Sequence, residues 1–303
     1  MAIIPKYLQP GDTIALASSA KKVDFQIVEN ARKHFESWGF QVIVGESAMA
    51  SEHQFAGDDE LRTKDFQTQL DNPNVNTIIC LRGGYGSVRI IEYLDFSEFV
   101  KHPKWIVGYS DVTVIQNHIL KNYNIASLHA EMPLKFPDFP NTNDSLGALK
   151  NALFGRIDPI RIQSNSLNKM GSAKGELVGG NLAILCSLLG SSSEMDTRGK
   201  ILFLEDVGEY LYAIDRMMMT LKRAGKLDQL AGLAIGQFTD LKDNDIPFGK
   251  TVYEIIAEHV ATYDYPVLFD VPTGHCEINK PLVFGGVYTM EITEESATLN
   301  IVV

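Results

Sequence analysis

The segment KWIVGYSDVTVIQNHILK, residues 104–121, begins with a strand pattern and ends with a helix pattern. Gly108 permits a tight bend between the two. A serine on such a bend projects its hydroxyl from the carboxyl end of the strand, where α/β proteins bind ligands. Ser110 is therefore either a nucleophile on a strand-to-helix elbow or, like Asp111, an N-cap of the helix. The usual elbow has a second glycine where this chain has Val112, so the segment alone favours the cap.

The sequence around this segment alternates between apolar strand patterns and amphipathic helix patterns. Strands are predicted at residues 13–17, 41–44, 75–81, 104–107 and 125–129, and helices at 25–38, 58–70, 87–94, 112–121 and 146–153. Asp58 or Asp59 is the expected cap of the second helix. Because the strands are almost continuously apolar, the alternation predicts a mostly parallel sheet with helices on both faces.

The second half of the chain predicts a further α/β domain. Helix patterns occur at residues 182–189, 210–224 and 252–261, strand patterns at 201–204, 233–238 and 267–269, and the last residues read as a hairpin turning at 294–296. Residues 161–176 are polar and rich in Ser, Asn and Gly, which is typical of a connection. We therefore expect two domains, residues 1–160 and 161–303.

Composition and charge narrow the classes of function. The chain has 303 residues and a formal net charge of -11, which disfavours nucleic acid as a partner. Its three cysteines are far apart and lack zinc-ligand spacing, so neither a disulfide framework nor a metal site is predicted. The first residues lack a secretory pattern, and no stretch approaches the length of a membrane span. These features predict a cytoplasmic protein without a membrane partner.

A glycine-rich turn, CLRGGYGSVRI at residues 80–90, also follows a predicted strand. Gly83 and Gly84 expose backbone N–H groups that can approach an anion, which suits an oxyanion hole, a phosphate cradle or simply a tight turn. The stretch matches neither common nucleotide-binding glycine motif, so a nucleotide-binding protein is a weak alternative. Arg82 either anchors a substrate carboxylate or forms a surface ion pair.

Acidic and imidazole side chains follow two later strands. Glu205 and Asp206 end the apolar run ILFL, and either could be a site carboxylate or part of a solvated loop. His275 lies in a loop bounded by Gly and Pro and is the favoured general base, with His129 as its competitor. Cys276 offers a weaker, alternative nucleophile. The residues occur in the order Ser, Glu, His, and a serine needs such partners to become nucleophilic.

Taken together, these segments resemble the LD-carboxypeptidase family, which includes muramoyltetrapeptide carboxypeptidases and the microcin C self-immunity peptidase. The residues that carry the resemblance are GDTIALASSA (11–20), LRGGYG (81–86), GYSD (108–111), GELVGGNL (175–182), LFLED (202–206) and PTGHC (272–276). The resemblance implies a two-domain serine peptidase whose active site lies at the domain interface. It implies a triad of Ser110, Glu205 and His275, and so chooses Glu205 over Asp206.

The resemblance also implies the remaining parts of the site. The backbone N–H groups of Gly84 and Asp111 would form the oxyanion hole, and Arg82, Gly83 and Tyr85 are expected to contact the substrate. No cofactor is needed, and family members are commonly homodimers. The expected reaction releases the terminal D-alanine from murein tetrapeptides during cell-wall recycling.

Two relatives with other functions are kept as alternatives. Immunity-type peptidases cleave peptide–nucleotide conjugates and carry aromatic residues before GGN, whereas residues 167–176 of this chain contain none. An inactive relative that binds a peptide is the other alternative, and the intact set of Ser110, Glu205 and His275 argues against it.

Overall fold

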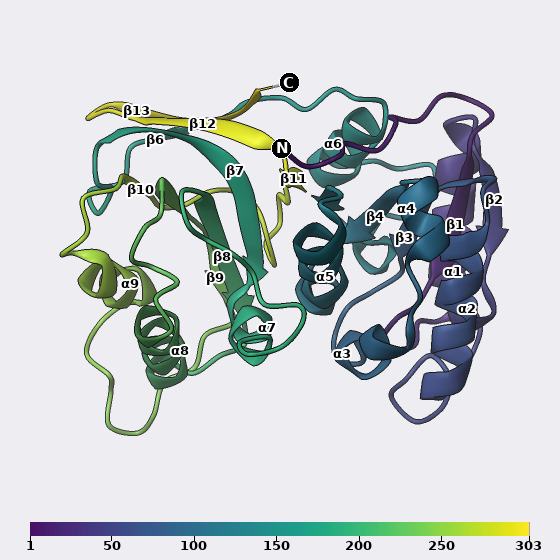
Figure 1. The fold of residues 1–303 in the computed structure, drawn as a ribbon, viewed down its shortest axis with the longest axis horizontal. Coiled ribbons are helices and arrows are strands. Elements are labelled where there is room, and N and C mark those ends of the chain that lie inside the picture. The colour runs from purple at the N-terminus through teal and green to yellow at the C-terminus, as the bar shows by residue number, and fades with distance from the viewer. Residues whose placement is uncertain (303) are drawn as a thin grey trace.

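Two β-sheets stand side by side in the computed structural model, which describes residues 1–302 (Figure 1). The first sheet has the strand order β11-β5-β4-β3-β1-β2. Its strands are β1 (Thr13–Ala17), β2 (Gln41–Val44), β3 (Val75–Cys80), β4 (Trp105–Gly108), β5 (Ser127–His129) and β11 (Leu282–Phe284). All neighbours run parallel except β11 and β5, which are antiparallel. The predicted, mostly parallel N-terminal sheet is thereby confirmed.

Helices flank this first sheet. They are α1 (Phe25–Ser37), α2 (Asp59–Asp71), α3 (Ser87–Ile90), α4 (Ser97–Lys101), α5 (Thr113–Tyr123) and α6 (Asp144–Leu153). The side chain of Asp58 accepts a hydrogen bond from the backbone N–H of Leu61 at 2.7 Å, so Asp58 is the cap of α2. α5 is followed by Asn124, which adopts the left-handed conformation common after helices.

The second sheet is mixed and has the order β10-β9-β8-β7-β12-β13-β6. Its strands are β6 (Ile160–Gln163), β7 (Gly171–Asn181), β8 (Ile201–Val207), β9 (Gly232–Thr239), β10 (Val267–Leu268), β12 (Val287–Ile292) and β13 (Ser296–Val302), and its helices are α7 (Leu182–Ser187), α8 (Leu211–Arg223) and α9 (Val252–Val260). β7 to β10 run parallel, whereas β12, β13 and β6 are antiparallel to their neighbours. The predicted C-terminal α/β domain and its closing hairpin are confirmed.

The polar stretch at residues 161–176 is the largest difference from the sequence prediction. It contains most of β6 and the first half of β7. β7 pairs through residues 171–176 with β12 and through residues 177–181 with β8, so partner strands hold it in place although its first residues are small and polar. The boundary between residues 160 and 161 stays a prediction, since β11 from the second half joins the first sheet.

α5 and the end of β7 join the two halves, and Figure 1 shows them side by side at the centre of the molecule. The Asn117 side chain donates to the Gly179 carbonyl at 3.1 Å, and the Asn181 backbone N–H donates to the Thr113 hydroxyl at 3.2 Å. A Cβ on Gly180 would lie 2.6 Å from that hydroxyl oxygen, so a glycine is required there. These contacts bring the carboxyl end of β7 close to the bend after β4. Within residues 1–302, no helix is long and apolar enough to cross a membrane.

Candidate active site

Ser110 lies on a sharp bend between β4 and α5. Its φ of 63° is in the left-handed region, and the preceding Gly108 has a φ of 155°. Such a conformation is costly for a residue with a side chain and often occurs at functional positions. The half-buried serine begins a short 3-10 turn, Ser110–Val112, that leads into α5.

The capping interpretation of Ser110 and Asp111 is wrong. Within residues 1–302, no side chain caps either the 3-10 turn or α5. The Asp111 carboxylate instead accepts a hydrogen bond at 2.8 Å from the backbone N–H of Ser87, the first residue of α3. Burial raises the pKa of Asp111, although the hydrogen bonds from Ser87 and Gly86 oppose that rise. Asp111 therefore ties the bend to the glycine-rich turn.

Gly83 and Gly84 place backbone next to the Ser110 hydroxyl. A Cβ on Gly83 would lie 2.8 Å from Ser110 Cβ, 3.0 Å from its Oγ and 3.2 Å from the Asp111 backbone nitrogen. Gly84 has a φ of 110°, and its backbone N–H has no hydrogen-bond acceptor within the described part of the chain. Gly83 therefore packs directly against Ser110 and the Asp111 backbone nitrogen, and the backbone N–H of Gly84 is a candidate donor to an oxyanion.

His275 and Glu205 form a hydrogen-bonded pair at the end of β8. The ring nitrogen Nδ1 of His275 lies 2.7 Å from Glu205 Oε2, and the backbone N–H of His275 donates to the same oxygen at 3.2 Å. Glu205 is fully buried, whereas 17% of the His275 side chain is exposed. A Cβ on Gly274 would lie 2.6 Å from Glu205 Oε2, so the glycine lets the histidine loop approach the carboxylate. Because Nδ1–H donates to the carboxylate, Nε2 is left as a proton acceptor.

Tyr109 connects this pair to the bend. Its ring lies 4.8 Å from the His275 imidazole, edge to face, and Tyr109 directly precedes Ser110. Within residues 1–302, Ser110 and His275 form no hydrogen bond with each other. Such contacts are often long in unliganded enzymes and tighten when substrate binds.

The charges around His275 favour its protonated form. Burial alone lowers the pKa of His275, but the hydrogen bond and charge of Glu205, with the charges of Asp206 and Glu131, outweigh burial and raise the pKa above its ordinary value. A raised pKa makes the neutral imidazole a stronger base, while a larger fraction of the imidazole is protonated at a given pH.

Asp206 makes different hydrogen bonds from Glu205 and, in the described part of the chain, none with His275. Its oxygens accept hydrogen bonds from the Asn181 side chain at 2.8 Å and from the backbone N–H groups of Ala183 and Val207 at 2.9 and 2.8 Å. Burial, followed by the charge of Glu205, raises the pKa of Asp206 to about 7 despite these bonds. Asp206 thus fixes the start of α7, and Glu205 is the carboxylate in contact with His275.

Neither rival of the proposed base and nucleophile has the required environment. His129 is fully buried among Tyr109, Phe203 and Phe284, and burial lowers its pKa to about 4, so it stays neutral and away from solvent. Burial, with the charges of Glu205 and Glu131, raises the pKa of the Cys276 thiol to about 12. A thiol that remains protonated is a poor nucleophile.

The three residues expected to contact substrate are placed differently. Gly83 lies against Ser110, whereas the exposed ring of Tyr85 lies 6.1 Å from the Phe55 ring. Arg82 donates from Nη1 to the Lys22 carbonyl at 3.1 Å, and its buried Nε has no partner within residues 1–302.

Lys21 was missed by the sequence analysis. A Cβ on Gly84 would lie 2.5 Å from Lys21 Cδ, so the lysine stem runs across the glycine turn. The contact joins the ends of β1 and β3, and no local pattern in the sequence indicates it. Within residues 1–302, no group of three or more His, Cys, Asp or Glu residues lies close enough together to hold a metal ion.

Comparisons with known proteins agree with this architecture. Residues 12–130 match the LD-carboxypeptidase N-terminal domain, and residues 174–290 match the LD-carboxypeptidase C-terminal domain. A probable murein peptide carboxypeptidase of Bacillus subtilis is 32% identical over 299 residues, which cover 98% of this chain and 94% of that protein.

Solved structures show the same fold. The crystal structure of a muramoyltetrapeptide carboxypeptidase from Oxalobacter formigenes has a TM-score of 0.87 and 27% identity, covering 95% of this chain and 98% of that one. The structure of MccF in complex with glutamyl sulfamoyl guanosine has a TM-score of 0.85 but 19% identity, covering 98% of each chain, and shows likeness of fold alone. From the two domain matches and the full-length relative, the chain belongs to the LD-carboxypeptidase family.

Proposed function

We propose that this carboxypeptidase is a serine enzyme that cleaves the L,D peptide bond of murein tetrapeptides and releases the terminal D-alanine. The observation that carries the proposal is the buried Glu205–His275 hydrogen bond of 2.7 Å, held by Tyr109 beside the strained bend at Ser110. A serine hydroxyl, an imidazole with a free Nε2 and a buried carboxylate are the three parts of a nucleophilic triad.

In the proposed mechanism, Ser110 Oγ attacks the carbonyl carbon of the residue before the terminal D-alanine. His275 Nε2 accepts the hydroxyl proton as the new C–O bond forms, and Glu205 stabilises the imidazolium. The carbonyl oxygen becomes an oxyanion that accepts hydrogen bonds from the backbone N–H groups of Gly84 and Asp111. His275 then donates its proton to the leaving amine as the C–N bond breaks, and water hydrolyses the acyl-enzyme by the same steps.

A carboxypeptidase must also recognise the free carboxylate at the end of its substrate. Two cations, Arg82 and Lys21, flank the Gly83–Gly84 turn, and the buried Arg82 Nε without a partner supports a role for Arg82. The names of the B. subtilis and O. formigenes relatives support a murein peptide as the substrate.

Cleavage of peptide–nucleotide conjugates is the alternative, supported by the fold of MccF. It is less favoured because residues 167–176, which precede GGN and include the start of β7, carry no aromatic ring to stack on a base. We also propose a cytoplasmic location, as expected from the sequence, and a homodimer, which rests on the resemblance to the family.

The test is a Ser110→Ala variant assayed for D-alanine release from a murein tetrapeptide. We expect release to fall to background while the variant remains folded, and a variant that retained the wild-type rate would exclude the serine mechanism. A tetrapeptide and an aminoacyl sulfamoyl nucleoside, offered to the wild-type protein in parallel, separate the two substrate classes.

A further inference from the structure

Arg62 is a fully buried arginine on α2 that lies outside the proposed triad and oxyanion hole. Its Nη1 donates to the Ser19 carbonyl at 2.6 Å and to the Gly86 carbonyl at 3.2 Å. Its Nε donates to the Gly57 carbonyl at 3.4 Å. One guanidinium thus holds the loop after β1, the glycine-rich turn after β3 and the loop before α2.

The turn at Gly86 is shaped around this guanidinium. Gly86 has a φ of 153°, and a Cβ there would lie 2.7 Å from Arg62 Nη1 and 2.8 Å from the Cα of Ala20. The backbone of the glycine-rich turn therefore packs directly on the arginine and on the loop after β1. This close packing fixes the end of the turn whose other end carries Gly84.

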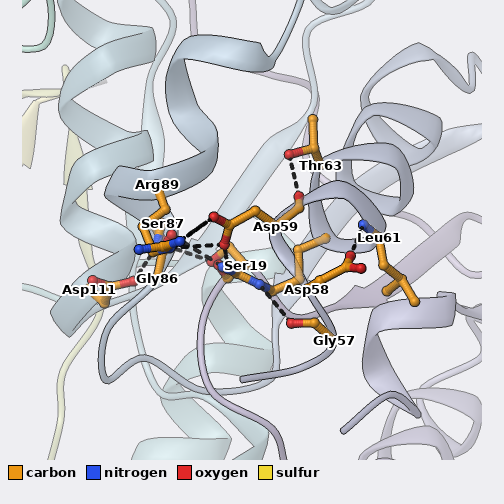
Figure 2. A network of polar contacts seen from close by, with 11 residues as sticks. Ser19, Gly57, Asp58, Asp59, Leu61, Thr63, Gly86, Ser87, Arg89 and Asp111 are labelled. Atoms are coloured by element: carbon orange, nitrogen blue, oxygen red, sulfur yellow. Dashed lines mark hydrogen bonds and ion pairs between the residues drawn. The ribbon is translucent and has the colours of Figure 1, made fainter. Parts of the chain in front are cut away.

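The contacts continue from Gly86 through Ser87 to Asp111, the residue after Ser110 (Figure 2). Ser87 follows Gly86, and its backbone N–H donates to the Asp111 carboxylate at 2.8 Å. The Ser87 hydroxyl also lies 2.7 Å from the Ser19 hydroxyl, which joins the same two loops a second time. Arg62 is thus connected to both proposed oxyanion donors, to Gly84 through the turn and to Asp111 through Ser87.

Asp59 balances the charge of this buried group. One oxygen of its carboxylate is ion-paired with Arg62. The other oxygen pairs with the half-exposed Arg89 at 2.6 Å (Figure 2). The Phe55 ring lies 4.9 Å from the Arg62 guanidinium carbon. Burying a charge is costly and often does not stabilise a protein more than apolar packing would. Arg62 is buried, and its N–H groups donate to three loops near Ser110. These contacts suit a role in fixing the positions of those loops.

We propose that Arg62 is a positioning residue for the oxyanion hole, which rests on the proposed serine mechanism. It holds Gly84 and Asp111 at the separation at which both backbone N–H groups reach the oxyanion. Arg62 does not contact the substrate, so its loss should weaken transition-state binding and leave ground-state binding intact.

The experiment compares Arg62→Met with Arg89→Met, a matched change in the exposed partner of the same Asp59. For Arg62→Met we expect kcat to fall about 100-fold with little change in KM, because a displacement of about 1 Å can have that effect. Affinity for a peptide boronate, which forms a tetrahedral adduct with the nucleophile, should fall in parallel, while affinity for the product tripeptide stays. Arg89→Met should keep the wild-type kcat.

A second variant guards against misfolding. If thermal unfolding shows that Arg62→Met is not folded, Arg62→Lys keeps the charge but loses the forked donors, and its kcat should fall by an intermediate factor at unchanged KM. A folded Arg62 variant with wild-type kcat and boronate affinity would overturn the proposal, as would an equal loss in Arg89→Met. If the wild-type protein does not bind the boronate and the Ser110→Ala variant keeps its activity, the serine mechanism itself is refuted.

Discussion

Replacing Glu205 by glutamine tests the hydrogen bond on which the candidate site depends. The change keeps the volume of a fully buried side chain but removes the charge that faces His275 Nδ1 at 2.7 Å. An amide can also turn its NH₂ group toward Nδ1, which would favour the wrong imidazole tautomer. In a triad of this kind such a change lowers kcat about 10⁴-fold, or about 5 kcal/mol of transition-state stabilisation.

The same variant should move the pH dependence of activity. The base must be neutral to accept a proton, so wild-type activity should rise with pH through a pKa above about 6.5. Glu205 is the main group that raises the pKa of His275, whereas burial lowers it. Without the carboxylate, the acidic limb of the kcat/KM profile should therefore move to lower pH.

The assay is D-alanine release by wild type and Glu205→Gln across the neutral pH range, with thermal unfolding as the check on folding. Asp206→Asn is the comparison, because it removes the adjacent charge and leaves the Glu205–His275 hydrogen bond in place. Its loss in kcat should be much smaller. A folded Glu205→Gln enzyme whose kcat falls less than about tenfold and whose acidic limb stays in place would refute the assigned role.

Three further changes probe the surroundings of the site. Gly83→Ala should lower kcat about 100-fold, because the new Cβ would lie 2.8 Å from Ser110 Cβ and push on that residue. The control is Gly147→Ala in α6, which has open space around it and should stabilise the protein by about 1 kcal/mol. A Gly83→Ala enzyme as active as Gly147→Ala would contradict the predicted clash with Ser110. Arg82→Met should raise KM for a free tetrapeptide but not for its C-terminal amide, and parallel changes for both substrates would exclude a carboxylate contact. His129 has a lowered pKa of about 4, so the unfolded chain binds its proton more readily and stability should fall as pH drops from about 6.5 to 4, by about 3 kcal/mol. In urea unfolding, His129→Phe should lose this part of the pH dependence, and an unchanged dependence would refute it.

Local patterns predicted the first half of the fold well. Each strand of the parallel sheet is a short apolar run, so its signal lies within a few residues, and the start of α2 is marked by its cap Asp58. β7 was missed because Gly171–Asn181 is rich in glycine and is stabilised by its partners β8 and β12. β11 was missed because three residues near position 283 pair with β5, about 155 residues earlier in the chain, and leave no local trace.

The sequence analysis named the segments of the candidate site but missed the hydrogen bonds that join them. The segments around Ser110, Glu205 and His275 were identified because each follows an apolar strand and together they resemble a family. The sequence assigned Asp111 to its own helix, whereas its carboxylate binds the N–H of Ser87, which lies 24 positions earlier. Arg62 drew no attention, because nothing in a polar helix indicates which of its charged residues is buried.

The antiparallel pairing of β11 with β5 has a consequence for how the molecule is made. The loop that carries His275 runs from β10 in one sheet to β11 in the other, so it is anchored at both ends in different sheets. Until the ribosome has synthesised residue 284, β5 lacks its neighbour and the first sheet has an open edge. The proposed active site therefore cannot be completed until the segment that pairs with β5 has been synthesised.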